Sequence, residues 1–245
     1  MVGLGAVAAT LVNWNVEWAT PRSWRSPEIL NRIEQHTPDI ICLTETHVGL
    51  LSRGGHVITS RADYGYKVKE ERRKVLLWSR EPWEQVDDVG SDMMPPGRFV
   101  SGVTRTSEGP MTVMGVCIPW ADSRVRGTAV KRMRWEDHRQ YLDGLSDVLD
   151  RIPVERLILV GDFNQRIQQG RRVPAEVRTA LQAVVGSRMT IATAGLGFRG
   201  RRSIDHVALG SDLTAEYLGA ISNLDGERRL SDHFGVVAGL SAGIK

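Results

Sequence analysis

The pattern of hydrophobic and polar positions predicts many short β-strands with a few helices between them. The clearest strand lies at residues 157–160, where four apolar residues stand in a row, as in a strand buried on both faces. Further strands are expected at residues 10–16, 39–43, 75–78, 99–104, 111–118, 207–209 and 236–240. The strands occur in both halves of the chain, so neither half is expected to be purely helical.

Three segments follow a helical pattern instead. One is expected to begin with Ser26 as N-cap and Pro27 as the first helical residue, and to end before Pro38. Residues 134–152 and 175–185 give the other two, because apolar residues recur there at steps of three and four. Strand-rich halves with interspersed helices predict a four-layer α/β sandwich, with two mixed sheets packed face to face and helices outside. Residues 1–245 are expected to form a single domain.

Polar residues stand at the ends of several of these strands. Asp162 and Asn164 follow the strand at 157–160 at alternate positions, so both side chains can point into one cavity. Polar residues also stand at or near strand ends in Asn13-Trp14-Asn15, Leu43-Thr44-Glu45-Thr46-His47, Ser203-Ile204-Asp205-His206 and Ser231-Asp232-His233-Phe234. One such turn alone would be read as a structural Asx-turn. Their repetition indicates a common polar site.

In this order, the motifs resemble those of the endonuclease/exonuclease/phosphatase (DNase I-like) superfamily of metal-dependent phosphoesterases. The resemblance runs from about Thr10 to Leu240. It implies the same four-layer sandwich and a divalent-metal-dependent hydrolysis of phosphoesters.

Oxygen donors at two strand ends are candidates for a metal site. Glu45 ends a buried strand, where an unpaired carboxylate would be costly, and Asn15 offers a neutral oxygen. The resemblance assigns both positions to the main metal site and places Asp232 near it, as a direct or water-mediated ligand. Such donors suit Mg²⁺ or Mn²⁺. The alternative is that Glu45 forms a structural ion pair with an arginine.

The resemblance also implies the catalytic residues. Asp205 and His233 would form a pair in which the carboxylate fixes the imidazole, and the imidazolium stabilises charge that develops on the phosphate. Asp162 would orient or deprotonate the attacking water, and Asn164 would hold a phosphate oxygen. Whether Asp162 is the acting base stays open at this stage.

One strand end departs from the family pattern. In Cys117-Ile118-Pro119-Trp120, the residues Cys117 and Trp120 supply neither the phenol or imidazole nor the amide found in related nucleases. A phosphate contact from this strand is therefore not expected. Trp120 is a candidate for stacking on a base, with ordinary packing as the alternative.

Charge bears on the substrate. The net charge is only +3, with a sequence pI of about 9.1, which permits a polyanionic partner without requiring one. Basic residues gather at 124–134 and, just before Asp205, at Arg199, Arg201 and Arg202. We therefore expect a nuclease or phosphodiesterase acting on nucleic acid. The alternatives are an enzyme for a phospholipid or a small phosphorylated metabolite, and an inactive binding module with the same fold.

The two cysteines and the hydropathy bear on location. Cys42 and Cys117 lie in apolar strand segments and are expected to be buried free thiols, as in a reducing compartment. No apolar run approaches the ~18 residues of a membrane span, and the apolar N-terminus lacks a preceding basic region. A cytoplasmic monomer without a signal peptide is expected.

Overall fold

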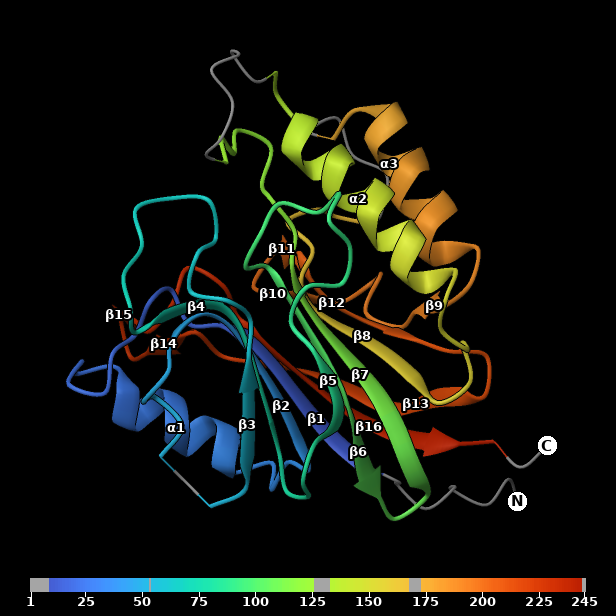
Figure 1. The fold of residues 1–245 in the computed structure, drawn as a ribbon. Coiled ribbons are helices and arrows are strands. Elements are labelled where there is room, and N and C mark those ends of the chain that lie inside the picture. Colours follow the sequence, from blue (N-terminus) through green and yellow to red (C-terminus); the bar gives the residue numbers. More distant parts are fainter. Residues whose placement is uncertain (1–8, 53, 126–132, 168–172, 244–245) are drawn as a thin grey trace.

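The computed structural model describes residues 9–52, 54–125, 133–167 and 173–243 (Figure 1). The first of two six-stranded mixed sheets has the strand order β13-β16-β1-β2-β4-β3. Its strands are β1 (Ala9–Asn15), β2 (Ile40–His47), β3 (His56–Thr59), β4 (Arg72–Ser79), β13 (Leu213–Ile221) and β16 (Gly235–Ala242). β1 runs parallel to β2 and antiparallel to β16, so the carboxyl ends of β1 and β2 meet the start of β16 at one edge.

The second sheet has the strand order β5-β6-β7-β8-β12-β9. Its strands are β5 (Glu84–Asp87), β6 (Phe99–Thr106), β7 (Gly109–Cys117), β8 (Leu157–Asp162), β9 (Thr190–Ile191) and β12 (Asp205–Leu209). β7 and β8 are parallel, and β12 is antiparallel to β8. Two short hairpins lie outside the main sheets: β10 (Gly197–Phe198) with β11 (Arg201–Arg202), and β14 (Leu224–Asp225) with β15 (Arg228–Arg229).

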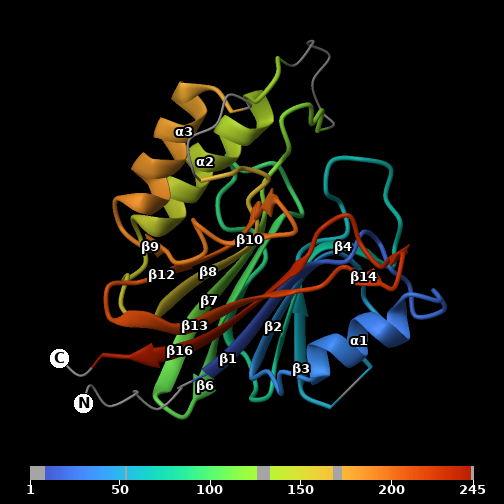
Figure 2. The same ribbon diagram turned by 180° about the vertical axis from the view of Figure 1, so that it is seen from behind.

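Helices cover the outer faces of the two sheets (Figure 2). Helix α1 (Ser26–Glu34) packs on the first sheet through Ile29 and Ile33. Helices α2 (Glu136–Leu149) and α3 (Ala175–Leu181) cover the second sheet, and α3 continues into a π-helical turn at Gln182–Gly186. The central core lies between the sheets and joins residues of both, among them Cys42, Val75, Val113, Val160 and Val236.

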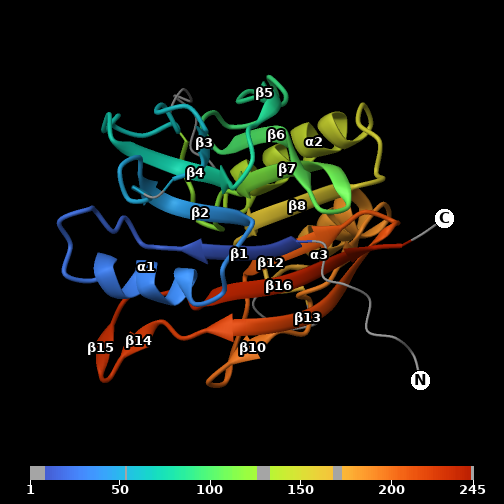
Figure 3. The ribbon, with the colours of Figure 1, turned by 90° about the horizontal axis from the view of Figure 1, so that it is seen from below.

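The four-layer α/β sandwich predicted from the sequence is therefore confirmed. Figure 3, seen from below, shows β4, β2, β1, β16 and β13 side by side, and Ala9 at the start of β1 pairs with Leu240 of β16. Within the described part of the chain, no helix is both long and apolar enough to cross a membrane.

Three local predictions are wrong. Ser26 is the first helical residue, not the N-cap, because Arg25 already has helical backbone angles and the Ser26 hydroxyl donates to the Thr20 carbonyl. The edge strand β3, which pairs with β4, was not among the strands expected from the sequence. The single helix expected at 175–185 changes to a π-turn after Leu181.

Candidate active site

The polar strand ends of both sheets meet at one end of the sandwich. From the first sheet come Asn15 at the end of β1, Glu45 in β2 and His233 just before β16. From the second come Asp162 at the end of β8 and Asp205 at the start of β12, which lie opposite each other in the β8–β12 register. The sequence placed these residues at strand ends, and the topology brings them together.

His233 and Asp205 form a hydrogen-bonded pair across the two sheets. The Nδ1 atom of His233 lies 2.6 Å from Oδ2 of Asp205, and both side chains are largely buried. Burial alone would lower the pKa of His233, but the carboxylates of Asp205 and Asp162 hold that pKa well above its ordinary value. The imidazole is thus kept protonated, with Nδ1–H donated to Asp205 and Nε2 left for a substrate.

Asp162 is fixed by two amides. Its Oδ2 atom accepts from Nδ2 of Asn15 (3.0 Å) and Nδ2 of Asn164 (3.1 Å), and its Oδ1 accepts from the Asn164 backbone N–H (2.9 Å). Burial, and then the negative charge of Asp205, raise the pKa of Asp162 to about 7. A carboxylate with that pKa can accept a proton near neutral pH.

Backbone conformation allows this end of β8 to turn. Gly161 has a φ of 144°, and a Cβ atom there would collide with the carbonyl oxygen of Val116 on β7. Asn164 (φ 52°) and Glu45 (φ 48°) adopt left-handed conformations that cost energy for residues other than glycine. Both strained residues belong to the polar cluster, so their conformations are tied to the placement of its side chains.

The cluster fits a hard divalent cation. The carboxylates of Asp162 and Asp205 lie close together beside His233. Asn15, hydrogen-bonded to Asp162, and Glu45, whose charge acts on Asp162, add oxygen donors. The buried Oδ1 atom of Asp205 has no hydrogen-bond partner among the described residues. Buried oxygen atoms with concentrated negative charge are the donors that Mg²⁺ and Mn²⁺ prefer.

The sequence matches the endonuclease/exonuclease/phosphatase family over residues 12–233. The chain belongs to this family. Members of the family are hydrolytic phosphoesterases that generally use divalent metals, and the chain is accordingly a phosphoesterase. No curated protein shows significant sequence similarity to it.

Solved structures share the family fold at low identity. A 3′–5′ exonuclease from Neisseria meningitidis is 18% identical, with a TM-score of 0.69 over 96% of this chain and 100% of its own. TDP2 from D. rerio, complexed with a single-strand DNA product, is 15% identical, with a TM-score of 0.63 over 95% and 98% of the two chains. An endonuclease/exonuclease/phosphatase from Beutenbergia cavernae is 17% identical, with a TM-score of 0.65 over 96% and 72%.

Among the residues expected from the family resemblance, Glu45 carries an ion pair. Its Oε1 atom lies 2.6 Å from Nζ of Lys74, near the start of β4. The sequence suggested, as the alternative to metal binding, an ion pair between Glu45 and an arginine. The partner in the structure is a lysine. Nothing in the local pattern around Lys74 pointed to this pair, because it depends on β4 lying beside β2.

The side-chain amide of Asn164 is hydrogen-bonded to two protein acceptors. Its Nδ2 group donates to the Ile118 carbonyl (2.9 Å) as well as to Asp162. Both amide N–H groups are thus engaged with protein acceptors, which leaves Oδ1 as the remaining polar atom. In this arrangement Asn164 positions Asp162 and β7; the predicted contact with a phosphate oxygen stays a prediction.

Asp232 lies on the histidine side of the site. Its carboxylate is half exposed, and Oδ1 is 3.9 Å from Nε2 of His233. The segment is held by Glu17, which accepts from the Asp232 backbone N–H, and by Ser231, whose hydroxyl donates to the Asn15 carbonyl. Trp14 Nε1 donates to the His233 carbonyl at 3.0 Å. These contacts fix the loop that carries His233 against the end of β1.

A cavity of about 660 Å³ opens beside His233 and Asp205. Arg201 and Arg202 line it, as the sequence predicted for a substrate-binding segment, and so does Arg166, which sequence reasoning missed. Arg199 lines smaller cavities next to it, with Arg201. None of these four arginines is paired with a carboxylate among the described residues. The hairpin therefore presents unneutralised positive charge beside the Asp205–His233 pair.

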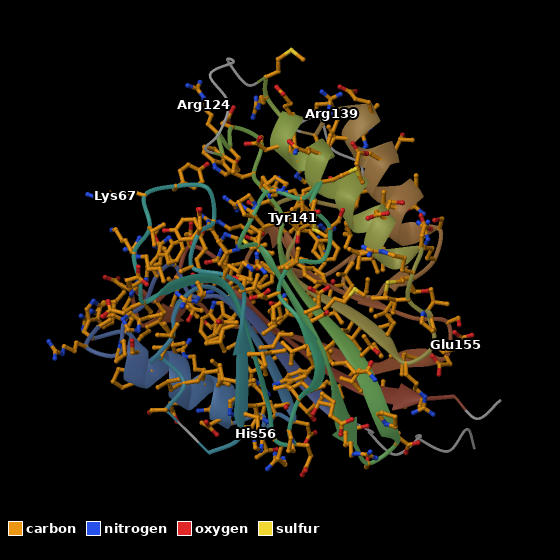
Figure 4. All side chains as sticks on the ribbon, in the orientation of Figure 1. His56, Lys67, Arg124, Arg139, Tyr141 and Glu155 are labelled. Atoms are coloured by element: carbon orange, nitrogen blue, oxygen red, sulfur yellow. The ribbon has the colours of Figure 1, made fainter. Side chains whose placement is uncertain are left out.

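The other predicted contacts are peripheral. Trp120 is 53% exposed and does not line the cavity beside His233. In the second basic cluster, Arg124 is exposed at the upper rim of the molecule (Figure 4), and Arg134 pairs with Asp122. Arg126, Lys131 and Arg132 lie outside the described residues.

Proposed function

We propose that the chain is a divalent-metal-dependent phosphodiesterase that hydrolyses nucleic acid. The observation that carries the proposal is the convergence of the Asp205–His233 pair, Asp162 and the oxygen donors Asn15 and Glu45 at one end of the sandwich. This set provides the proton acceptor, the cationic hydrogen-bond donor and the hard ligands that phosphodiester hydrolysis needs.

Each residue has a role in this proposal. Asp162, with its pKa raised to about 7, takes a proton from the attacking water, while Asn15 and Asn164 hold its carboxylate in place. His233 donates from Nε2 to the phosphate as negative charge develops, and Asp205 keeps the imidazole oriented and protonated. The catalytic groups lie on strand ends of both sheets, so their spacing is set by rigid elements.

Glu45 and Asn15 would hold the cation, with Asp232 close enough to the site for a water-mediated contact. Mg²⁺ or Mn²⁺ bound there would neutralise negative charge on the phosphate group. Zinc is disfavoured, because both cysteines are buried in strands and neither belongs to the polar cluster.

The charge of the β10–β11 hairpin supports nucleic acid as substrate. Arg199, Arg201 and Arg202 stand beside the catalytic pair without carboxylate partners, as expected of a surface that meets a phosphate backbone. The TDP2 structure holds a single-strand DNA product on the same fold. A phospholipid or a small phosphorylated metabolite is the second candidate, since the cavity of about 660 Å³ has room for a compact anionic group. A cytoplasmic location and a monomeric state stay predictions; the buried thiols of Cys42 and Cys117 support the former.

Cleavage assays test the proposal. Plasmid DNA, short single strands of DNA and RNA, and a lipid panel should be incubated with Mg²⁺, with Mn²⁺ and with EDTA. We expect nucleic-acid cleavage that EDTA abolishes, and a loss of at least about 10²-fold in Glu45→Ala, because that change removes a ligand carboxylate. The exposed Glu227→Ala is the matched control and should retain wild-type activity. Activity that survives both EDTA and Glu45→Ala would refute the metal role, and cleavage of lipids alone would favour the second candidate.

A further inference from the structure

Lys74 is a buried cation that the proposed mechanism does not use. It lies near the start of β4 with only 8% of its surface exposed, next to β2 in the first sheet. Its ammonium group is 2.6 Å from Oε1 of Glu45, and it also lies over the rings of Trp18 (5.1 Å) and Tyr64 (5.7 Å). These contacts hold the ammonium beside Glu45, one of the proposed metal ligands.

The carboxyl end of strand β7 offers no strong polar group to a substrate. Cys117, at the end of β7, is fully buried, and burial raises the pKa of its thiol to about 12, although the positive charges of Lys74 and Arg98 oppose that rise. A neutral, buried thiol is a weak hydrogen-bond donor and does not neutralise charge. Lys74 and Arg98 therefore surround this strand end with the positive charge that Cys117 does not provide.

The ammonium group of Lys74 retains unused donor capacity. Three N–H groups are present, and Glu45 Oε1 is the only hydrogen-bond acceptor that contacts Nζ within the described residues. Two N–H groups remain for a ligand. Because the lysine is already held by Glu45 and by two rings, little side-chain freedom would be lost when it contacts an anion.

We propose that Lys74 is a phosphate-contacting residue, which donates to a non-bridging oxygen of the scissile phosphate from the Glu45 side of the site. This inference rests on the proposed hydrolysis of phosphoesters at the cluster. In this proposal His233 and Lys74 both donate to the phosphate, and the lysine takes over the phosphate contact that the β7 strand end cannot make. A lysine that merely neutralises Glu45 would instead weaken cation binding and contribute nothing to the reaction.

Two neutral variants separate these roles. Lys74→Met keeps the aliphatic chain against Trp18 and Tyr64, and Lys74→Gln keeps a hydrogen-bond donor for Glu45 without the charge. Lys74→Arg retains the charge. Arg72→Met is the matched control, because the Arg72 guanidinium also lies over Trp18, at 4.6 Å, without contacting Glu45. Thermal unfolding of each variant checks that the fold is intact.

Three measurements decide between the roles: kcat at saturating Mn²⁺ and substrate, binding of Mn²⁺ alone, and binding of inorganic phosphate to the Mn²⁺-loaded protein. We expect both neutral variants to lower kcat by about 10²-fold and to weaken phosphate binding by about 10-fold, while Mn²⁺ binds at least as tightly as in wild type. Lys74→Arg should recover part of both losses, and Arg72→Met should behave like wild type.

Other outcomes would overturn the inference. Wild-type kcat and phosphate binding in the neutral variants, together with tighter Mn²⁺ binding, would make Lys74 a counter-ion of Glu45 only. Failure of the Lys74 contact can be told apart from failure of the proposed function. If wild type cleaves no phosphodiester yet binds phosphate in a Lys74-dependent manner, the contact stands and the proposed function fails. If wild type is active and the neutral variants match it, the proposed function stands and the contact fails.

Discussion

At the scale of single residues, the site depends on pairs of side chains that are distant in sequence. Asp205 and His233 are 28 positions apart and share a 2.6 Å hydrogen bond. Asn15 and Asp162 are 147 positions apart and share another, at 3.0 Å. Each pair satisfies a buried polar group that would otherwise be costly, so fold and site stabilise one another.

The Asp205–His233 pair should act as a unit. We expect Asp205→Asn and His233→Ala each to lower kcat by about 10²–10⁴-fold, because each change leaves the imidazolium either unoriented or absent. The double variant should lose little more than the worse single variant. Steady-state kinetics at saturating Mg²⁺ measures this, with the exposed His56→Ala as a control. Losses that multiply would show that the two residues contribute independently.

At the scale of elements, the β10–β11 hairpin carries positive charge that faces the cavity beside His233. Arg201 and Arg202 line the cavity of about 660 Å³ beside His233, and Arg199 extends the basic surface outward. The hairpin has only two residues in each strand and leads directly into Asp205. We therefore expect a change in this element to alter substrate binding while the proposed metal ligands Asn15 and Glu45, on other strand ends, stay in place.

The triple variant Arg199→Ala, Arg201→Ala and Arg202→Ala should bind nucleic acid more weakly and with less dependence on salt. Each lost phosphate contact should flatten the slope of log affinity against log salt by roughly 0.7–0.9. The loss should be similar for unrelated sequences, because phosphate contacts do not read bases. Fluorescence anisotropy with labelled DNA and RNA at several salt concentrations measures this.

A matched triple variant tests whether the position of the charge matters. Arg80, Arg105 and Arg151 are exposed arginines that do not line the cavity beside His233, and their replacement by Ala removes the same charge. We expect the control to keep the wild-type slope. An unchanged slope in the hairpin variant would exclude the hairpin from the binding surface. No salt-dependent affinity in wild type would favour the lipid or small-metabolite alternative.

At the scale of the whole molecule, buried histidines tie stability to pH. His206, next to Asp205, is fully buried between Thr193 and Gln165, with hydrogen bonds of 3.0 and 2.9 Å to Oγ1 and the carbonyl oxygen. Burial lowers its pKa from 6.5 to about 4, although the hydrogen bond to Gln165 opposes the change. The folded protein therefore favours the neutral form of the His206 imidazole, and protonation of that side chain favours unfolding.

The sign of the pH dependence follows from that shift. The stability associated with neutral His206 is fully present above pH 6.5 and is lost as the pH falls toward 4, where the folded protein also becomes protonated. The loss from this residue should approach about 3 kcal/mol, at about 1.4 kcal/mol for each unit of pKa shift. Urea unfolding at pH 7, 5.5 and 4 in the presence of EDTA measures it.

The variant His206→Gln isolates this contribution. Glutamine can still donate to the Gln165 carbonyl and does not titrate, so its free energy of unfolding should fall less steeply below pH 6.5 than that of wild type. The carboxylates and the buried His138 contribute equally to the pH dependence of unfolding in both proteins. Their contributions therefore cancel when the two free energies of unfolding are subtracted. Parallel pH profiles for the two proteins would contradict the assignment to His206.

The sequence by itself determined the strands that are buried on both faces, the order of the polar motifs and the family. Local periodicity encodes whether a segment is buried, and the polar strand ends of Asn15, Glu45, Asp162 and His233 were visible because a polar residue after an apolar run stands out. The expected burial of Cys42 and Cys117 is confirmed for the same reason. Edge strands such as β3 and β13 escaped detection, since they are half exposed and lack a continuous apolar run.

Only the tertiary structure decided which side chains meet. The Lys74–Glu45 ion pair depends on the β2–β4 pairing, and the place of Arg166 in the cavity wall depends on how the chain turns after Asn164. Both amide donors of Asn164 are taken up by Ile118 and Asp162, which no sequence pattern indicated. Strand register and sheet packing are set by the sum of many contacts across the core. The residues next to a polar residue in the sequence therefore do not determine its partner in the fold.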